Sequence, residues 1–118
     1  NSTMTLPTNL DHIATTAQYE EILSNNKNVM LCVGRMGPMC VPVYSAMESL
    51  RKDYSNVKFM DMAFDSHTAD VIRALPETNG FMGLPFTLYF QDGKIVKATS
   101  SIQSNHQIKE VLDTYFSH

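Results

Sequence analysis

The run Val29 to Val33 is the feature that most limits what this chain can fold into. All of its residues are apolar, and turn-forming residues flank it, with Asn25 to Asn28 before it and Gly34 after it. A short strand without alternating polar residues is typical of a sheet centre that is buried on both faces. Such a strand requires helices on either side of the sheet. The run therefore predicts an α/β domain.

Helix and strand signals alternate on both sides of this run. Thr15 with Gln18, and Ser104 with Gln107, form capping boxes, which mark the first turn of a helix. Apolar residues at helical spacing predict helices near residues 15–25, 40–54, 68–75 and 104–115. Apolar segments predict strands near residues 12–14, 29–33, 57–64, 86–90 and 95–99.

The last two strands are expected to form a hairpin, because Asp92-Gly93 supplies the positive φ angles that tight turns require. The order is then β-α-β-α-β-α-β-β-α, a mixed β-sheet flanked by helices on both faces. Residues 1–10 are mostly polar and carry Pro7, so we expect a loosely packed polar N-terminal tail there. Residues 11–118 are expected to form a single domain.

Composition limits the partners. The 118 residues carry a net charge of −3, and no run of lysine and arginine occurs. This balance argues against nucleic acid or an anionic membrane surface as a partner. No apolar stretch approaches the roughly 20 residues that span a bilayer, and the start shows no signal-peptide core. We therefore predict a cytoplasmic protein with neither kind of partner.

The C-terminal third resembles a known family. "GLPFTLYFQDGKIV" is similar to the cis-proline strand and hairpin of the thioredoxin family, and "SNHQIKEVLDTYF" is similar to its closing helix. The resemblance extends from His12 to Phe116. It implies a thioredoxin fold, a cis Leu84–Pro85 bond, and a groove at that turn in which backbone groups dock an extended substrate peptide.

The loop after the central strand departs from the family. Where the family has Trp-Cys-Gly-Pro-Cys, this chain reads "GRMGPMCVPVY". Aligned without a gap, Met36 takes the tryptophan position, Gly37 the first cysteine and Cys40 the second, with Pro38 and Met39 between them. Aligned with a one-residue deletion, "MGPM" covers the whole Cys-Gly-Pro-Cys segment and Cys40 follows it. Both registers remove the attacking thiol.

The buried face of the following helix favours the ungapped register. That register places Ala46, Met47 and Leu50 on the core side, whereas the gapped one would bury Ser45 and Ser49. The active site then reads GPMC in place of CGPC.

The ungapped register also predicts replacements at other positions that the family uses for dithiol–disulfide exchange. Leu31 stands where the family keeps a buried carboxylate that moves a proton for the second cysteine. Val33 and Met36 take two tryptophan positions, and Asp61 replaces a partner lysine. Together with Gly37, these replacements indicate altered or lost dithiol chemistry.

Cys40 is the predicted catalytic residue. It lies in the first turn of a helix, where the dipole favours a thiolate, and Gly37 has no side chain to shield it. We therefore expect an open thiol that forms mixed disulfides or glutathione adducts. An inert, half-buried cysteine is the alternative. Cys32, inside the buried strand, is expected to be core filler and not a disulfide partner of Cys40.

Three classes of function follow. The first is a thioredoxin-like protein that acts in thiol redox homeostasis or mixed-disulfide chemistry through Cys40, on a protein or peptide or with glutathione. The second is a redox-inactive module that binds a peptide or protein. The third is Cu(I) binding through Met36, Met39 and Cys40, although no metal or cofactor is required. The predicted substrate-binding residues are Met36, Gly37, Pro38, Met39, Leu84 and Pro85.

Two surface features complete the sequence-based expectations. The segment "PETNGFMG" lengthens the connection before Pro85 and is placed to reshape the groove. The histidines are scattered at loops and ends and are expected to be surface residues: His12, His67, His106 and His118.

Overall fold

The computed structural model describes residues 5–116, which form a five-stranded sheet and four α-helices in the predicted order. The elements are β1 (Asp11–His12), α1 (Thr16–Asn25), β2 (Asn28–Gly34), α2 (Val41–Leu50), β3 (Lys58–Ala63), α3 (Ala69–Arg73), the 3-10 turn η1 (Pro76–Thr78), β4 (Phe86–Gln91), β5 (Lys94–Ser100) and α4 (Asn105–Tyr115). No helix among the described residues is long and apolar enough to cross a membrane.

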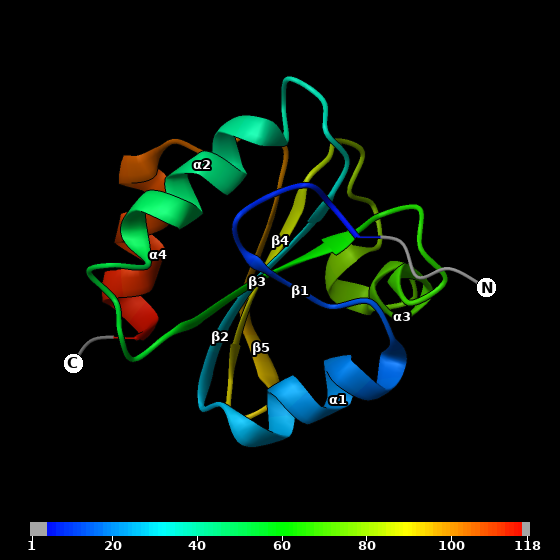
Figure 1. Cartoon of the computed structure of the whole chain (residues 1–118), viewed down its shortest axis with the longest axis horizontal. Helices are drawn as coiled ribbons and strands as arrows, with labels where there is room; N and C mark the ends of the chain where they lie inside the picture. Colours follow the sequence, from blue (N-terminus) through cyan, green and yellow to red (C-terminus); the bar gives the residue numbers. More distant parts are fainter. Residues whose placement is uncertain (1–4, 117–118) are drawn as a thin grey trace.

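Strand β2 lies at the centre of the sheet, as the apolar run predicts. The strand order is β1-β3-β2-β4-β5, with β2 parallel to β3 and antiparallel to β4. All residues of β2 are buried. Helices α2 and α4 cover one face of the sheet, while α1 and α3 cover the other (Figure 1).

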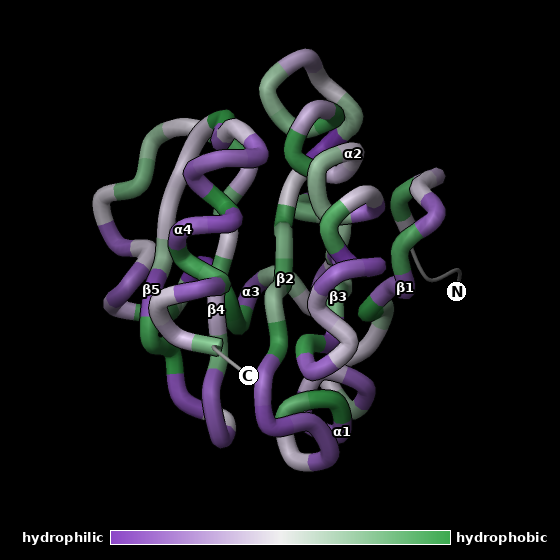
Figure 2. The backbone as a smooth tube through the Cα atoms, turned by 90° about the vertical axis from the view of Figure 1, so that its left-hand side faces the viewer, coloured by the Kyte–Doolittle hydropathy of each residue, from purple (hydrophilic) through white to green (hydrophobic). Residues whose placement is uncertain are grey.

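The sheet separates two hydrophobic clusters. Along β2, Met30 and Cys32 belong to the cluster that includes residues of α2 and α4, whereas Leu31 and Val33 belong to the cluster on the other face. This alternation follows from the two-residue period of a strand. Figure 2 shows hydrophobic residues along β2 in the middle of the molecule and mixed polar and apolar residues around α4. Any functional site over the middle of the sheet therefore draws its side chains from one of these two faces.

Local sequence signals set several element ends. Thr15 Oγ1 accepts a hydrogen bond from Gln18 N–H at 3.1 Å, and Ser104 Oγ accepts one from Gln107 N–H at 3.2 Å. Each glutamine side chain accepts from the backbone N–H of its cap in return, so both predicted capping boxes are present.

The hairpin turn also has the predicted geometry. Asp92 and Gly93 have φ angles of 53° and 80° between β4 and β5. These positive values match the twist of the two strands that the turn connects. The turn sequence alone was therefore enough to place the hairpin.

Helix α2 ends at Leu50, before the predicted end near Tyr54. The chain turns after Leu50, whose carbonyl accepts a hydrogen bond from Asp53 N–H at 2.9 Å. The turn brings Tyr54 into the core, where its hydroxyl donates to Asp113 Oδ1 at 2.6 Å. This contact with α4 involves a residue far along the chain, so no local signal announces it.

The segment before β1 packs against the domain, which corrects the expectation of a loose tail. Leu6 and Leu10 are only 7% and 3% exposed and belong to the cluster that includes α2. Asn9 is held on both sides, because its N–H donates to Glu48 Oε2 at 3.0 Å and its carbonyl accepts from Arg51 Nη1 at 3.0 Å. Residues 1–4 of the expected tail lie outside the described residues.

Candidate functional site

Cys40 is the N-cap residue of α2. A tight turn leads into it, since the Gly37 carbonyl accepts hydrogen bonds from Cys40 N–H at 3.1 Å and from Val41 N–H at 3.0 Å. Pro42 lies in the first turn of the helix, where its missing N–H leaves no partner unsatisfied. The next N–H groups turn back onto Cys40 itself, because Val43 N–H and Tyr44 N–H donate to its carbonyl at 3.0 Å and 3.2 Å.

The sulfur of Cys40 points into the protein. The residue is 3% exposed, and Sγ accepts a hydrogen bond from Arg35 N–H at 3.4 Å. A Cβ placed on Gly34 would lie 2.9 Å from this sulfur. It would also lie 2.7 Å from the hydroxyl oxygen of Tyr44 and 3.0 Å from Cβ of Pro85. Sulfur, phenol and proline ring therefore fill the space that a side chain at position 34 would need.

The expectation that Gly37 leaves Cys40 open is wrong. A Cβ placed on Gly37 would have no atom within 4 Å, so this glycine faces open space. The Cys40 side chain is directed away from it, toward Gly34 and Pro85. The accessibility of the thiol is thus decided by packing at the end of β2 and not by the residue at the first cysteine position.

The buried face of α2 is the one that the ungapped alignment requires. Ala46, Met47 and Leu50 are buried, and Ser45 and Ser49 are exposed. This pattern orients the helix so that Cys40 lies over the end of β2.

Cys32 is a second thiol on the same face, and both cysteines are free. Cys32 is fully buried in β2, and its sulfur accepts a weak hydrogen bond from Thr87 Oγ1 at 3.9 Å. Burial raises the pKa of the Cys32 thiol well above its ordinary value, because a thiolate there would lose its hydration. Cys32 therefore stays a neutral thiol.

A row of polar side chains crosses the sheet beneath α2. The strand register pairs His12 with Asp61, Asp61 with Cys32, and Cys32 with Thr87. His12 Nδ1 lies 2.6 Å from Asp61 Oδ1, and Thr8 Oγ1 donates to the other carboxylate oxygen. Asp61 itself is fully buried. A carboxylate thus lies on the same face of the sheet as both thiols.

This row corrects two expectations. Leu31 lies on the face of the sheet away from Cys40. A carboxylate at position 31 would therefore not face this thiol. The carboxylate on the Cys40 face is that of Asp61. His12 is not a free surface residue, because its ring pairs with Asp61 and is 29% exposed. Of the other histidines, His67 and His106 are exposed, and His118 lies outside the described residues.

Replacing Asp61 with asparagine is expected to change how stability depends on pH. Burial raises the pKa of Asp61 above its ordinary value, although the hydrogen bonds from His12 and Thr8 oppose the rise. Between the ordinary and the raised pKa, the folded state holds a proton that the unfolded state has released. The Asp61 contribution to stability therefore falls as the pH rises through this window.

Urea unfolding of the wild type and Asp61→Asn between pH 4 and pH 7 measures this effect. We expect the free energy of unfolding of the wild type to fall relative to that of the variant as the pH rises. Carboxylates with lowered pKa, such as Asp11 beside Lys58 and Asp65 beside Arg35, act in the opposite direction, and the comparison subtracts them. A relative rise would show that pairing with His12 outweighs burial.

Exposed apolar side chains occur in the loop before Cys40, at the start of α2 and in the segment before β4. Met36 and Met39 in the loop are 45% and 43% exposed, Val41 at the start of α2 is 37% exposed, and Met82 before β4 is 96% exposed. We call these four residues the methionine rim. Among the predicted binding residues, Met36, Pro38 and Met39 are exposed, Gly37 and Leu84 are half-buried, and Pro85 is buried.

The structure does not favour a Cu(I) site at the methionine rim. Met36 and Met39 are exposed, whereas Cys40 is buried with its sulfur directed toward β2. Within residues 5–116, no group of three or more His, Cys, Asp and Glu side chains is arranged to hold a metal ion.

The turn before β4 faces the end of β2. The Leu84–Pro85 bond is cis, the isomer that the family resemblance implies. Ser101 N–H donates to the carbonyls of Gly83 and Pro85, at 3.2 Å and 3.1 Å. Leu84 lies between these acceptors and makes no backbone hydrogen bond among the described residues. Its N–H and carbonyl therefore have no backbone partner within residues 5–116.

The extra segment before this turn is anchored to the core. Thr78 is buried, and its hydroxyl donates to the Ile72 carbonyl at 2.6 Å. The Phe81 ring packs on the Phe86 ring with centroids 5.4 Å apart. Met82 is the large apolar side chain of this segment that is exposed, at 96%. The insertion thus adds one exposed apolar side chain to the methionine rim.

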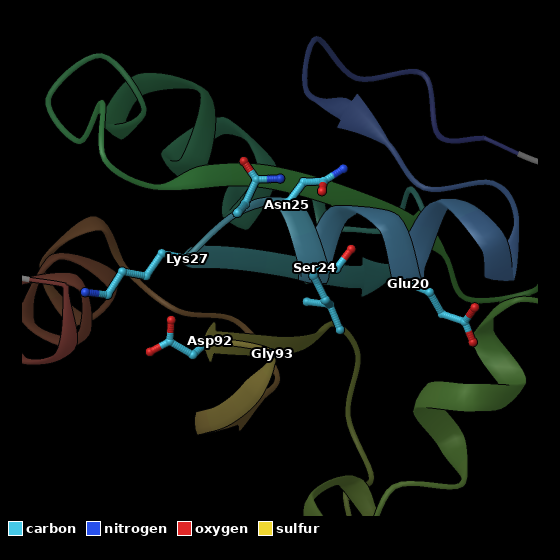
Figure 3. A pocket seen from close by; sticks show the side chains of 8 residues that line it. Glu20, Ser24, Asn25, Lys27, Asp92 and Gly93 are labelled. Atoms are coloured by element: carbon cyan, nitrogen blue, oxygen red, sulfur yellow. The ribbon is translucent and has the colours of Figure 1, made fainter.

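A shallow hollow of about 610 Å³ lies at the end of α1 beside the turn between β4 and β5. Figure 3 shows Glu20, Ser24, Lys27 and Asp92 around it, with no cysteine among the labelled side chains. The Asp92 turn lies at the opposite end of β4 from Pro85, so this hollow is separate from the surroundings of Cys40.

Comparison of this chain with known proteins finds a relative in sequence. No protein-family profile matches the chain. A curated thioredoxin from Mycoplasmoides gallisepticum is 26% identical over 108 residues, which cover 87% of this chain and 99% of that protein. This protein is thioredoxin-like.

Solved structures support the same conclusion about the fold. The Plasmodium falciparum thioredoxin superposes with a TM-score of 0.74 at 18% identity and covers 90% of this thioredoxin-like chain and 99% of its own. The Fasciola hepatica thioredoxin has the same TM-score at 19% identity, with 90% and 99% of the two chains covered. A mutant thioredoxin from Halobacterium salinarum also has a TM-score of 0.74, at 17% identity and 95% coverage of both chains.

Sequence reasoning missed two groups on the Cys40 face of the sheet in this thioredoxin-like protein. Tyr44 was not singled out, although its spacing from Cys40 places it on the same side of α2. Asp61 was assigned only as the replacement of a lysine, and its pairing with His12 has no local signal because the residues lie 49 positions apart.

Proposed function

We propose that this thioredoxin-like protein acts in thiol redox homeostasis through one cysteine, Cys40. The observation that carries the proposal is the position of its sulfur, at the N-terminus of α2, beside Pro85, with Arg35 N–H donating to it. A helix N-terminus and an N–H donor both stabilise a thiolate, which is the nucleophilic form. The similarity to a curated thioredoxin supports a redox role.

The chemistry is a single exchange. The Cys40 thiolate attacks one sulfur of a substrate disulfide, the disulfide bond breaks, and the leaving thiolate takes a proton from water. Gly37 supplies no second thiol, and Cys32 is a buried neutral thiol. The mixed disulfide therefore waits for an external thiol such as glutathione, whose thiolate attacks the substrate sulfur, forms a glutathione–substrate disulfide and releases Cys40 as a thiolate.

The substrate is a protein or peptide in extended form. The free backbone N–H and carbonyl of Leu84 can pair with an added strand, which is a recurring mode of peptide recognition. The methionine rim suits apolar side chains of varied shape, because methionine is flexible and polarizable. A reducing compartment such as the cytoplasm suits a chain in which both cysteines are free.

The second candidate function is a redox-inactive module that binds a peptide or protein at the same groove. Its supporting observation is the 3% exposure of Cys40, because a buried thiol is often only packed. In this case Leu84 and the methionine rim do the binding, and no bond to sulfur forms.

The deciding experiment is incubation with oxidised glutathione followed by intact mass measurement. We expect one glutathione adduct on the wild type and on Cys32→Ser, and none on Cys40→Ser, because only the Cys40 sulfur lies at the helix start. In an insulin reduction assay we expect no catalytic turnover. Wild-type protein without an adduct would favour the binding module, and turnover without a second protein would contradict the assignment of Gly37.

A further inference from the structure

Tyr44 and Cys40 lie one helical turn apart and hold the same residue of the preceding loop. The Tyr44 hydroxyl donates to the Arg35 carbonyl at 2.9 Å, and Arg35 N–H donates to Cys40 Sγ at 3.4 Å. Residues four positions apart share one side of a helix, so both side chains reach Arg35 from α2. The loop is thereby held at both backbone polar groups of Arg35, its carbonyl and its N–H.

The phenol also lies beside the sulfur. The hydroxyl oxygen of Tyr44 and the sulfur of Cys40 both lie within 3 Å of the same point, the place of a Cβ on Gly34. The hydroxyl and the sulfur are therefore neighbours, although the hydroxyl donates to the Arg35 carbonyl in this structure. Tyr44 is 2% exposed, and burial raises its pKa above the ordinary value. The phenol therefore keeps its proton and can act only as a neutral donor toward a thiolate.

Other groups near Tyr44 do not supply such a donor. Asp61 on β3 would repel a negative charge on sulfur, and Cys32 on β2 is a neutral thiol. The guanidinium of Arg35 is engaged by Asp65, to which Nε donates at 2.8 Å. The remaining charged or titratable groups around Asp61 are His12 and Glu48. The exposed Arg35 side chain also favours negative charge on Cys40 through its own charge, but among the buried side chains that the structure describes it is Tyr44 that places a hydroxyl beside the sulfur.

We propose that Tyr44 is a positioning residue for Cys40, and that its hydroxyl turns from the Arg35 carbonyl to the sulfur when the thiol ionises. The Cys40 proton goes to a base in the solvent, and the phenol keeps its own. The proposal deepens the proposed function, on which it rests, because it explains how a thiol that is almost fully buried can carry negative charge.

The test is Tyr44→Phe, with the ionisation of Cys40 followed by thiolate absorbance near 240 nm. The same titration of Cys40→Ser is subtracted to remove the tyrosine signal. A hydrogen bond to a charged group contributes enough that its loss moves the ionisation midpoint upward by about one pH unit. At a pH below both midpoints, the rate of alkylation by iodoacetamide then falls about tenfold, because the rate follows the thiolate fraction.

Tyr89→Phe is the matched control. Tyr89 is fully buried in the same cluster, and its hydroxyl has no hydrogen-bond partner among the described residues. Removing this hydroxyl should leave the midpoint unchanged. Should Tyr44→Phe fail to fold, 3-fluorotyrosine at position 44 keeps the ring in place and is a stronger donor, so it should move the midpoint downward.

The outcomes separate the two proposals. An unchanged midpoint in Tyr44→Phe would overturn the role of Tyr44, as would faster alkylation at every pH with the same midpoint, since the hydroxyl would then only shield the sulfur from the reagent. If the midpoint shifts as expected but no glutathione adduct forms on the wild type, the role of Tyr44 stands and the monothiol function fails.

Discussion

Replacing Gly34 with alanine is expected to lower the free energy of unfolding by about 2 kcal/mol, the middle of the range for overpacking a core. The new methyl group would lie 2.7 Å from the Tyr44 hydroxyl oxygen, 2.9 Å from Cys40 Sγ and 3.0 Å from Cβ of Pro85. All three contacts are shorter than van der Waals separation, and β2 is buried on both faces, so the strand has little freedom to move. Urea unfolding followed by circular dichroism measures the loss.

Gly37→Ala is the matched control for this change. It adds the same methyl group three residues away, where no atom lies within 4 Å of the new Cβ. We expect a change within about 0.5 kcal/mol, as for ordinary surface substitutions. Equal stability of Gly34→Ala and Gly37→Ala would mean that the sulfur, phenol and proline ring are not closely packed around position 34. It would also weaken the account of why Cys40 is buried.

Replacing Leu10 with alanine is expected to lower the free energy of unfolding by about 3 kcal/mol, within the range for buried leucine. Leu10 is 3% exposed and packs in the cluster shared with α2. The lost side chain would leave a cavity between the N-terminal segment and the helix that carries Cys40. The measurement is again equilibrium unfolding in urea, where a lower midpoint with an unchanged slope reports lost stability.

Ile102→Ala provides the comparison for Leu10. This residue is also a large aliphatic one, but it is 44% exposed. Its replacement should change stability by no more than about 0.5 kcal/mol. If Leu10→Ala were equally harmless, the N-terminal segment would be the loose tail that its polar composition predicts.

Gly34→Ala and Leu10→Ala both alter the packing of α2, from two different sides of the helix. Gly34 lies under the start of α2, and Leu10 belongs to the segment that Glu48 and Arg51 hold against the same helix. The position of α2 over the sheet therefore depends on packing from both sides. Since Cys40 is the N-cap residue of this helix, either change should also alter the accessibility of its thiol.

Local patterns determined much of the architecture. The apolar run of β2 predicted a central strand because a strand buried on both faces has no polar alternation. Capping boxes at Thr15 and Ser104, and the turn at Asp92, specified where elements begin or reverse. Each of these signals acts through hydrogen bonds or φ angles within a few residues, so it can be recognised without knowledge of the fold.

The surroundings of Cys40 were predictable only in part. Its place at a helix start follows from the helix pattern, and the buried face of α2 agrees with the predicted one. Its burial does not follow, because it depends on Gly34 and Pro85, which belong to two different strands or their ends. The prediction from Gly37 failed because it considered only the neighbour in sequence.

What the sequence by itself determined about this thioredoxin-like protein is the order of its elements, the central strand and the single thiol at the start of α2. The tertiary structure alone decided the environment of that thiol. Asp61 meets His12 across 49 residues and Thr8 across 53, and Leu10 reaches the core from a segment without helical or strand periodicity. The physical reason is that sheet register and helix packing, which join distant residues, select which polar groups are buried together.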